Sequence, residues 1–348
     1  MQPKESPKKI RTRAPLRLGF AGGGTDVSPF SDEYGGFVLN ATIDKYAYAT
    51  ITSRDDGLVE LLAADGQISW RGPATEVLPL VKGLELQAGV YNRVRREFGR
   101  SEPLSISIVT HSEAQPGSGL GSSSTIVVAL VRAFCEYLTL PLSQYDIAHL
   151  AYEIERIDLG FAGGKQDQYA AAFGGLNFME FYRDRVIVNP LRIKQKNRAE
   201  LESSLVLFYT GISRESANII NEQVTNVIIG NEHSLQGMHD LKAKALHMKE
   251  ALLMGDLDAF SAAMRMSWEA KKKMANGITN QKINDIYQTA IKEGARAGKV
   301  SGAGGGGYMM FIVDPVKRSR VISCLQEFSG SVSTCKFVEQ GVDSWRVT

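Results

Sequence analysis

The sequence predicts an α+β fold with two regions of different pattern. The first half combines stretches that alternate between apolar and polar residues, typical of half-buried strands, with stretches of helical periodicity. The second half is dominated by a helical region over 215–293, followed by a glycine-rich loop and an apolar strand. A polar stretch at 194–202 separates the two regions, so we expect domains at 1–198 and 199–348.

The individual elements follow from the same patterns. Strands are expected at 37–53, 57–62 and 105–110, and helices at 89–97, 122–138 and 144–157. Residues 178–182 and 185–191 flank a turn at Arg183–Asp184 and predict a β-hairpin. The second region opens with a strand at 205–210 and reaches its last apolar strand at 308–313.

Composition argues against several classes of protein. A length of 348 residues is sufficient for two domains with a substantial core, and a net charge of +2 argues against a general nucleic-acid binder. Arg132 and Glu136 interrupt the most apolar helix, so no membrane span is expected, and the basic N-terminal stretch lacks the apolar core of a signal peptide. Cys135, Cys324 and Cys335 lack metal-ligand spacing and cannot all pair, which favours the reducing cytoplasm.

The most informative motif is the central glycine loop, residues 116–124, which joins an expected strand to an expected helix. Alternate glycines let backbone N–H groups converge on an anion, and the serines stand at a helix N-terminus, where the macrodipole favours phosphate. The loop lacks the lysine of a Walker A motif and the glycine spacing of a dinucleotide fingerprint. It predicts a nucleotide triphosphate site formed by Pro116, Gly117, Ser118, Gly119, Leu120, Gly121, Ser122, Ser123 and Ser124.

Two further glycine clusters lie near the ends of the chain. The N-terminal glycine loop, residues 22–26, ends in Thr25 and Asp26, a polar pair suited to hydrogen-bonding a sugar. The C-terminal glycine loop, residues 301–307, has five glycines in seven residues. Glycine is entropically costly in regular structure, so both loops are expected where the backbone closely approaches a ligand.

The order of these motifs resembles the GHMP kinase superfamily. Its three motifs correspond to residues 13–26, 116–124 and 299–307, in the same order and over nearly the whole chain. The Ala-Gly-Gly-Gly-Thr-Asp sequence of the first motif and the segment 207–214 resemble the branch of bacterial D-glycero-D-manno-heptose 7-phosphate kinases. The resemblance implies an N-terminal domain like ribosomal protein S5 domain 2, a ferredoxin-like C-terminal domain, and an active site between them.

The same resemblance implies a kinase that uses ATP and Mg²⁺. The γ-phosphate would pass to the anomeric hydroxyl of D-glycero-D-manno-heptose 7-phosphate, and the 1,7-bisphosphate would enter nucleotide-activated heptose synthesis. An anomeric kinase of an unphosphorylated sugar such as fucose or galactose stays open as an alternative, as does a catalytically silent sensor of sugar and nucleotide. The expected partners are small molecules, with no nucleic acid and no membrane, and the oligomeric state stays open, a homodimer included.

Phosphoryl transfer needs a metal ion on the triphosphate and a group that orients or deprotonates the nucleophile. The resemblance implies Ser123 and Glu155 as the magnesium ligands, and one hydroxyl with one carboxylate suits Mg²⁺ beside phosphates. Ser122 and Ser124 remain alternatives to Ser123. The resemblance also implies Asp167 as the base that takes the proton of the anomeric hydroxyl.

Two basic residues are expected beside Asp167. Arg17 matches the basic residue of the first motif, and Lys165 is proposed from its proximity in sequence. Both would keep the carboxylate ionised and stabilise negative charge on the transferred phosphoryl group. The triple lysine 271–273 is expected to be a solvated helix face instead.

The sugar is expected between the two terminal glycine loops. The residues expected to bind it are Gly23, Gly24, Thr25, Asp26, Gly304 and Gly305. A phosphate on the sugar requires a cationic partner, because a dianion is not desolvated without one. Arg214 is the first candidate for that partner, and Arg54 and Arg156 are weaker candidates. The five histidines show no metal-binding spacing.

Overall fold

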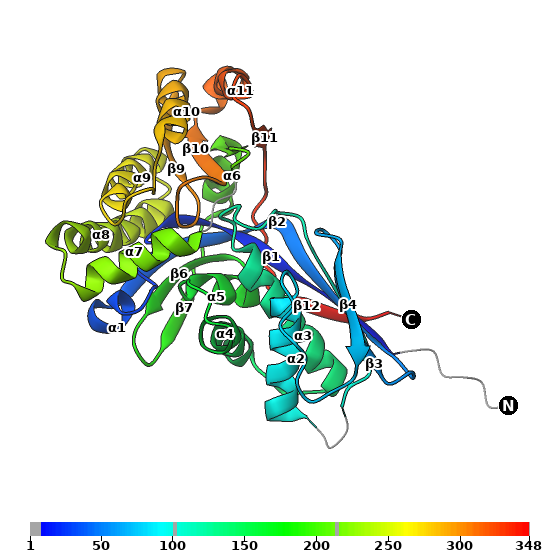
Figure 1. Cartoon of the computed structure of the whole chain (residues 1–348). Coiled ribbons are helices and arrows are strands. Elements are labelled where there is room, and N and C mark those ends of the chain that lie inside the picture. Colours follow the sequence, from blue (N-terminus) through cyan, green and yellow to red (C-terminus); the bar gives the residue numbers. More distant parts are fainter. Residues whose placement is uncertain (1–7, 100–102, 213–215, 348) are drawn as a thin grey trace.

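The computed structural model describes residues 8–99, 103–212 and 216–347, which form two β-sheets with helices around them (Figure 1). The strands of the first sheet are β1 (Lys9–Ala21), β2 (Gly36–Ser53), β3 (Leu58–Ala63), β4 (Ile68–Pro73), β5 (Ile106–Ser112), β6 (Leu176–Phe181), β7 (Val186–Pro190) and β12 (Asp343–Arg346). The long strand β2 has two partners besides β1, because residues 36–41 pair with β6 and residues 47–53 pair with β5.

The strands of the first sheet run in the order β12-β1-β2-β5-β3-β4, and β7 joins through β6. Only the β3–β5 pair is parallel among the described strands, since every other pair is antiparallel. After β5, the chain continues into the central glycine loop and then into helix α3 (Ser122–Leu138). The fold therefore places that loop at the end of a strand and the start of a helix.

Helices of the first half cover one face of this sheet (Figure 1). They are α2 (Glu85–Phe98), α3, α4 (Gln144–Glu153), the π-helical turn η1 (Ile154–Asp158) and α5 (Gln166–Phe173), and the short α1 (Phe30–Tyr34) precedes β2. Helix α4 begins with a capping box, in which Ser143 and Asp146 satisfy each other's backbone N–H groups. Helix α3 begins after Gly121, whose φ of +78° favours glycine, and buries residues on most of its surface.

The second sheet is antiparallel throughout, in the order β11-β8-β10-β9. Its strands are β8 (Leu205–Tyr209), β9 (Ala295–Val300), β10 (Tyr308–Val313) and β11 (Ser331–Ser333). The helices around it are α6 (Gln195–Ser204), α7 (Ser216–Ile228), α8 (Glu232–Met254), α9 (Leu257–Lys272), α10 (Gln281–Lys292) and α11 (Arg318–Gln326), with a 3₁₀ turn η2 (Pro315–Lys317). Asn231, Asp256 and Asn280 cap α8, α9 and α10, so the long helical region is divided at these side chains.

Three apolar clusters join these layers. The first lies between the first sheet and helices α2 to α5, and the third lies within the second sheet and its helices. The second cluster connects the two halves, because Leu16, Leu18 and Phe20 of β1 pack with Met248 of α8 and Phe260 of α9. Each fully buried side chain of this size contributes about 1.5–3 kcal/mol. The two halves of the chain are therefore held together by a shared core.

Most predicted elements are confirmed, with differences at their ends. The helix predicted at 122–138 is α3, whereas the helix predicted at 144–157 ends as α4 at Glu153 and continues as η1. The polar stretch predicted to separate the regions forms most of α6, and β12 returns to pair with β1. The division at residue 198 stays a prediction. None of the helices in the described ranges is both long and apolar enough to cross a membrane.

Candidate active site

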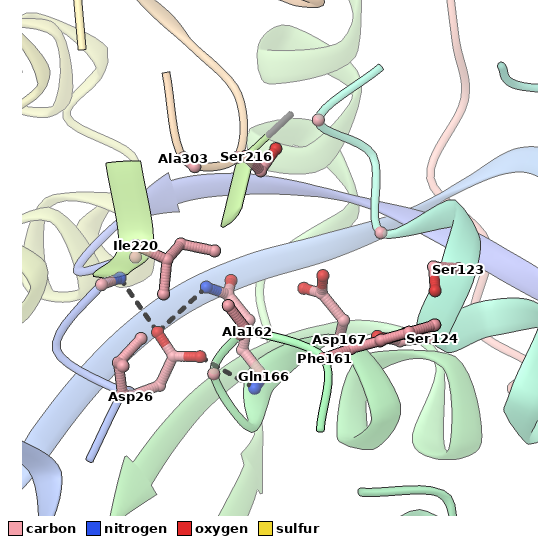
Figure 2. Close-up of a pocket in the computed structure, with 18 of the residues that line it drawn as sticks. Asp26, Ser123, Ser124, Phe161, Ala162, Gln166, Asp167, Ser216, Ile220 and Ala303 are labelled. Carbon is pink, nitrogen blue, oxygen red and sulfur yellow. Dashed lines mark hydrogen bonds between the residues drawn. The ribbon is translucent and has the colours of Figure 1, made fainter. Parts of the chain in front are cut away.

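A pocket lies where the three glycine loops meet (Figure 2). Direct hydrogen bonds join the central glycine loop to β1 and to the C-terminal glycine loop. The backbone N–H of Arg17, in β1, donates to the carbonyl of Leu120 at 3.1 Å, and the hydroxyl of Ser301 donates to the carbonyl of Gly119 at 2.8 Å. The backbone N–H of Tyr308 donates to the carbonyl of Ser118 at 2.8 Å. Motifs almost 300 residues apart in sequence therefore line one site.

Glycine is required where the central and C-terminal glycine loops touch. Gly119 has a φ of +81°, and a Cβ there would lie 2.4 Å from the carbonyl oxygen of Ser301. Gly302 has a φ of +72°, and its Cβ would lie 2.7 Å from the Cα of Gly119. The two backbones approach too closely for any side chain, so these glycines allow the loops to pack.

The three serines at the start of α3 have different environments. Ser122 points away from the pocket centre, because its Oγ lies 2.6 Å from Ser112 Oγ and donates to the carbonyl of Ala114 at 3.0 Å. Ser124 Oγ accepts hydrogen bonds from Gln168 Nε2 at 3.1 Å and Arg156 Nη2 at 3.3 Å. Ser123 is exposed, and its Oγ donates to Glu155 Oε1 at 2.7 Å. Of the three, Ser123 is the one available to a metal.

Glu155 is the acidic partner of Ser123. It belongs to the π-helical turn η1, and its side chain is 1% exposed. Its second oxygen, Oε2, accepts a hydrogen bond from Gln168 Nε2 at 2.6 Å, and Arg156 Nη1 lies 3.5 Å from Oε1. A hydroxyl and a carboxylate that converge beside the central glycine loop form a donor set that suits Mg²⁺. Single π-helical turns often mark functional sites.

Other members of the central glycine loop have separate roles. Ser118 is buried and lines the pocket, and its Oγ has no hydrogen-bond partner among the described residues. Such a hydroxyl is available to a phosphate oxygen. Leu120 lies instead in the core between the two halves, and neither Leu120 nor Pro116 lines the pocket. The loop therefore contributes its glycines and serines to the pocket.

Arg17 and Asp167 form the closest ion pair in the pocket. Arg17 Nε and Nη2 lie 2.7 and 2.6 Å from the same oxygen, Oδ1 of Asp167. Arg17 Nη1 donates to the carbonyl of Gly119 at 2.5 Å, so the guanidinium also holds the central glycine loop. The side chain of Asp167 is 20% exposed and lines the pocket, at the first turn of α5. The geometry brings these two residues together as the sequence predicts.

Lys165 is placed elsewhere, which corrects the expectation from its proximity in sequence. Its Nζ donates to Asp32 Oδ1 at 3.1 Å and to the carbonyl of Tyr182 at 3.2 Å, and Lys165 does not line the pocket. Lys165 occupies the N-cap position of α5, two positions before Asp167. Residues two positions apart at a helix do not face each other, so proximity in sequence was misleading.

Lys271 is a cation of the pocket that the sequence reasoning missed. The triple lysine was expected to be solvated, but Lys271 is 2% exposed, and its Nζ donates to the carbonyls of Gly302 at 2.6 Å and Gly23 at 3.2 Å. Burial lowers the pKa of Lys271 to about 8. The spacing of Met264, Trp268 and Lys271 (i, i+4, i+7) marks one face of α9 and could have identified it.

Asp26 is enclosed by the protein. It is 1% exposed, and its carboxylate accepts hydrogen bonds from the backbone N–H groups of Gly24 at 2.9 Å and Gln166 at 3.0 Å, and from Gln166 Nε2 at 3.2 Å (Figure 2). Gly23, Gly24 and Asp26 line the pocket, whereas Thr25 does not. The hydroxyl of Thr25 donates to the carbonyl of Gly22 at 2.8 Å, so Thr25 holds the turn of the N-terminal glycine loop.

Gly304 and Gly305 do not line the pocket, and the expectation that they bind the sugar is corrected. The backbone N–H of Gly305 donates to the carbonyl of Ile278 at 2.8 Å, and a Cβ on Gly304 would lie 2.7 Å from the same oxygen. These glycines allow the loop to pack on the segment between α9 and α10. Gly302 and Ala303 are the residues of this loop that line the pocket.

The arginines predicted for a sugar phosphate also differ in position. Arg54 pairs with Asp56 and Glu60 and does not line the pocket, whereas Arg156 does. Arg214 lies outside the described residues. The helix α7 contributes Ser216, Ile220 and Gln223 to the pocket, and no sequence motif signalled these residues.

Comparison with known proteins shows the family of this chain. A family model described as GHMP kinases N terminal domain matches residues 85–175, and one described as GHMP kinases C terminal matches residues 248–330. The D-glycero-alpha-D-manno-heptose 7-phosphate kinase of Campylobacter jejuni subsp. jejuni serotype O:2 is 47% identical over 341 residues, which cover 98% of this chain and 100% of that protein. The chain belongs to the GHMP kinase family.

Two solved structures are similar to this GHMP kinase. One is named a D-glycero-D-manno-heptose 1-phosphate kinase from Bacteriodes thetaiotaomicron, with a TM-score of 0.82 and 44% identity over 97% of this chain and 99% of that chain. The other is a putative sugar kinase from Campylobacter jejuni, with a TM-score of 0.80 and 46% identity over 97% and 98%. The predicted two-domain α+β fold is thus confirmed. The protein is a phosphotransferase, and GHMP kinases use ATP.

Proposed function

We propose that this GHMP kinase transfers the γ-phosphoryl group of ATP to the anomeric hydroxyl of D-glycero-D-manno-heptose 7-phosphate. The product is the 1,7-bisphosphate, which supplies nucleotide-activated heptose synthesis. The 47% identity over the full length of the Campylobacter jejuni heptose 7-phosphate kinase carries this proposal. The pocket supports this proposal, because it combines a glycine loop suited to phosphate, a carboxylate paired with arginine, and a cavity lined by glycines where a polar ligand can approach the backbone.

The triphosphate would bind the central glycine loop. Backbone N–H groups at the start of α3 and the unpaired hydroxyl of Ser118 provide hydrogen-bond donors for phosphate oxygens. Ser123 and Glu155 would hold Mg²⁺, which neutralises charge on the phosphates when it is bound. Gln168 and Arg156 fix the carboxylate of Glu155, so the pair is preorganised by the protein.

Asp167 would act as the base. The proton of the anomeric hydroxyl passes to Asp167, the freed oxygen forms a bond to the γ-phosphorus, and the bond from that phosphorus to the β-bridging oxygen breaks to release ADP. Arg17 holds Oδ1 of Asp167 and orients the carboxylate by doing so. An anomeric hydroxyl is more acidic than an ordinary alcohol, so a carboxylate suffices as the base.

The sugar would lie over the N-terminal glycine loop, at Gly23, Gly24 and Asp26. Arg156 lines the pocket, but its guanidinium already donates hydrogen bonds to the carbonyls of Phe161 and Gly164 and to Ser124 Oγ. Arg214 stays the proposed partner of the 7-phosphate.

The names of the relatives differ over the position of the phosphate, as one specifies heptose 7-phosphate and another heptose 1-phosphate. ADP release should therefore be measured with heptose 7-phosphate, heptose 1-phosphate, unphosphorylated heptose, fucose and galactose. We expect turnover of the 7-phosphate alone, because the anomeric oxygen of the 1-phosphate is already esterified. Turnover of the 1-phosphate or of a free sugar would reject the proposed substrate. ATP binding without any turnover would favour a sensor.

The proposed compartment is the cytoplasm. Cys135, Cys324 and Cys335 are free and buried, and burial raises the pKa of Cys135 to about 11 and that of Cys335 to about 12. Thiols of this kind are unreactive, because the thiolate is the reactive form.

The homodimer stays an open proposal that sedimentation of the purified protein would test.

A further inference from the structure

Two polar side chains, Gln166 and Lys271, lie close to Gly23 in the pocket. A Cβ added to Gly23 would lie 3.2 Å from Gln166 Nε2, 3.9 Å from Lys271 Nζ and 4.0 Å from Gln166 Oε1. Asp26 contacts the same amide, because Gln166 Nε2 donates to Asp26 Oδ1 at 3.2 Å (Figure 2). These groups come from α5, from α9 and from the N-terminal glycine loop, so the fold assembles them at one place.

Asp26 fixes the orientation of the Gln166 amide. A carboxylate only accepts hydrogen bonds, so the NH₂ group of Gln166 must face Asp26, and Nε2 lies 3.2 Å from Oδ1. The amide oxygen Oε1 consequently faces the other way. It is buried and has no hydrogen-bond partner among the described residues. A buried acceptor that the protein leaves unpaired is costly and requires an explanation, such as a bound ligand.

Lys271 supplies a donor beside this acceptor. An ammonium group has three N–H bonds, and among the described residues the hydrogen-bond partners of Lys271 are the carbonyls of Gly23 and Gly302. No carboxylate of the described residues lies within ion-pair distance of Lys271, although Asp26 and Asp167 are near enough to raise its pKa against the effect of burial. One N–H of a buried cation thus remains for a ligand in the pocket.

We propose that Gln166 and Lys271 together bind the ring hydroxyls of the sugar, with Gln166 Oε1 as acceptor and Lys271 Nζ as donor. A sugar hydroxyl both donates and accepts, so neighbouring hydroxyls match such a pair. Asp26 is then a positioning residue, since its carboxylate already accepts three hydrogen bonds from the protein and orients the amide. This inference rests on the proposed function and specifies which residues recognise the sugar.

Near-isosteric variants test the pair. We expect Gln166→Met and Lys271→Met to raise the KM for heptose 7-phosphate at least about fivefold each, while the KM for ATP changes less than about twofold. The matched controls are Gln281→Met, at an exposed position of α10, and Lys272→Met, whose amine pairs with Glu269 outside the pocket. The controls should leave both constants unchanged.

A purely structural role would have a different signature. Lys271 joins two loops, so its loss could disturb the whole pocket and raise the KM for ATP and for sugar equally. That result, or an unchanged sugar KM in Gln166→Met, would overturn the inference while leaving the proposed function intact. Failure of the unaltered enzyme to turn over heptose 7-phosphate would overturn the proposed function, and this inference with it.

Singly deoxygenated analogues of heptose 7-phosphate give a second measurement. It compares kcat/KM for two sugars on the same enzyme, so it does not depend on how much of a variant is folded. Removal of the hydroxyl that contacts Gln166 should lower kcat/KM of the unaltered enzyme at least about fivefold, but should cost Gln166→Met less than about twofold. One analogue of the series should show this coupling. If every analogue loses as much in the variant as in the unaltered enzyme, Gln166 does not bind a hydroxyl.

Discussion

Arg17 and Asp167 are 150 positions apart in the chain, yet two nitrogens of the arginine lie 2.6 and 2.7 Å from one oxygen of the aspartate. The third nitrogen, Nη1, donates to the carbonyl of Gly119. The guanidinium therefore fixes the carboxylate relative to the phosphate-binding loop. This relationship links the proposed base to the proposed nucleotide site, and the central account of the mechanism depends on it.

The first prediction concerns the base itself. Asp167→Asn keeps the size of the side chain but cannot take a proton at neutral pH, so kcat should fall by about 10²–10⁴. The affinity for ATP should change little, because the central glycine loop does not require a charge on residue 167. Steady-state kinetics with a separate titration of nucleotide binding would measure both quantities.

Lys165→Met is the matched control for this experiment. Its amine is bound by Asp32 and Tyr182, so kcat should stay within a few-fold of the unaltered enzyme. The free energy of unfolding in urea should instead fall by about 1–3 kcal/mol, because Asp32 loses a part-buried partner. If kcat of Lys165→Met fell as low as that of Asp167→Asn, Lys165 would have to be counted among the catalytic residues.

The second prediction separates two adjacent serines. Ser123→Ala removes a hydroxyl that faces Glu155, so the Mg²⁺ concentration for half-maximal rate should rise about tenfold at saturating ATP. Ser122→Ala removes a hydroxyl bonded to Ser112 and Ala114, and should lower stability without changing the Mg²⁺ requirement. Equal Mg²⁺ requirements in the two variants would exclude Ser123 as a ligand.

The third prediction concerns the contact between two glycine loops. Gly119→Ala places a methyl group 2.4 Å from the carbonyl oxygen of Ser301 at a φ of +81°, so ATP affinity should fall at least about tenfold. Gly57→Ala has a similar φ of +71° but nothing within 4 Å of its Cβ. It should cost only the backbone strain, about 1–2 kcal/mol, with unchanged affinity. Equal losses of ATP affinity in the two variants would mean that backbone strain, and not the contact with Ser301, lowers the affinity.

The fourth prediction follows from the buried lysine. The pKa of Lys271 is about 8 in the folded chain against 10.5 for the free side chain. Between these values the unfolded chain holds a proton that the folded chain lacks, so the free energy of unfolding should rise with pH from 8 to 10.5, by up to about 1.4 kcal/mol per unit.

Lys271→Met should flatten this rise. Lys271 also lowers the pKa of Lys299, so its removal reduces the contribution of Lys299 in the same direction. Urea unfolding at pH 7.5 and 9.5 would compare the two proteins. A variant whose stability rises as steeply as that of the unaltered enzyme would show that Lys271 does not titrate in this window.

The sequence was sufficient for the parts of the site that local chemistry defines. A glycine-rich turn followed by an apolar helical pattern is a local signal, so the bounds of helix α3 could be predicted to the residue. The proposed pair of Ser123 and Glu155 also came together in space. Ser122 was left open because the sequence cannot show that its hydroxyl is held by Ser112, ten residues earlier.

The parts that failed depend on tertiary packing. Lys271 looked solvated within a run of charges, and only its position on the Met264–Trp268 face of α9 shows that it is buried. Gly304 and Gly305 fit a ligand loop equally well, yet Ile278 packs against them. The return of β12 to the first sheet rests on backbone pairing with β1, which leaves no periodic signal in four residues.

Phosphorus NMR of the reaction with MgATP and D-glycero-D-manno-heptose 7-phosphate tests the central claim most directly. We expect a new anomeric phosphate signal coupled to the anomeric proton, with the 7-phosphate signal retained and one ADP formed for each bisphosphate. Phosphate transferred to any other position, or ADP formed with no new phosphate ester, would contradict the assignment of this pocket as an anomeric kinase site.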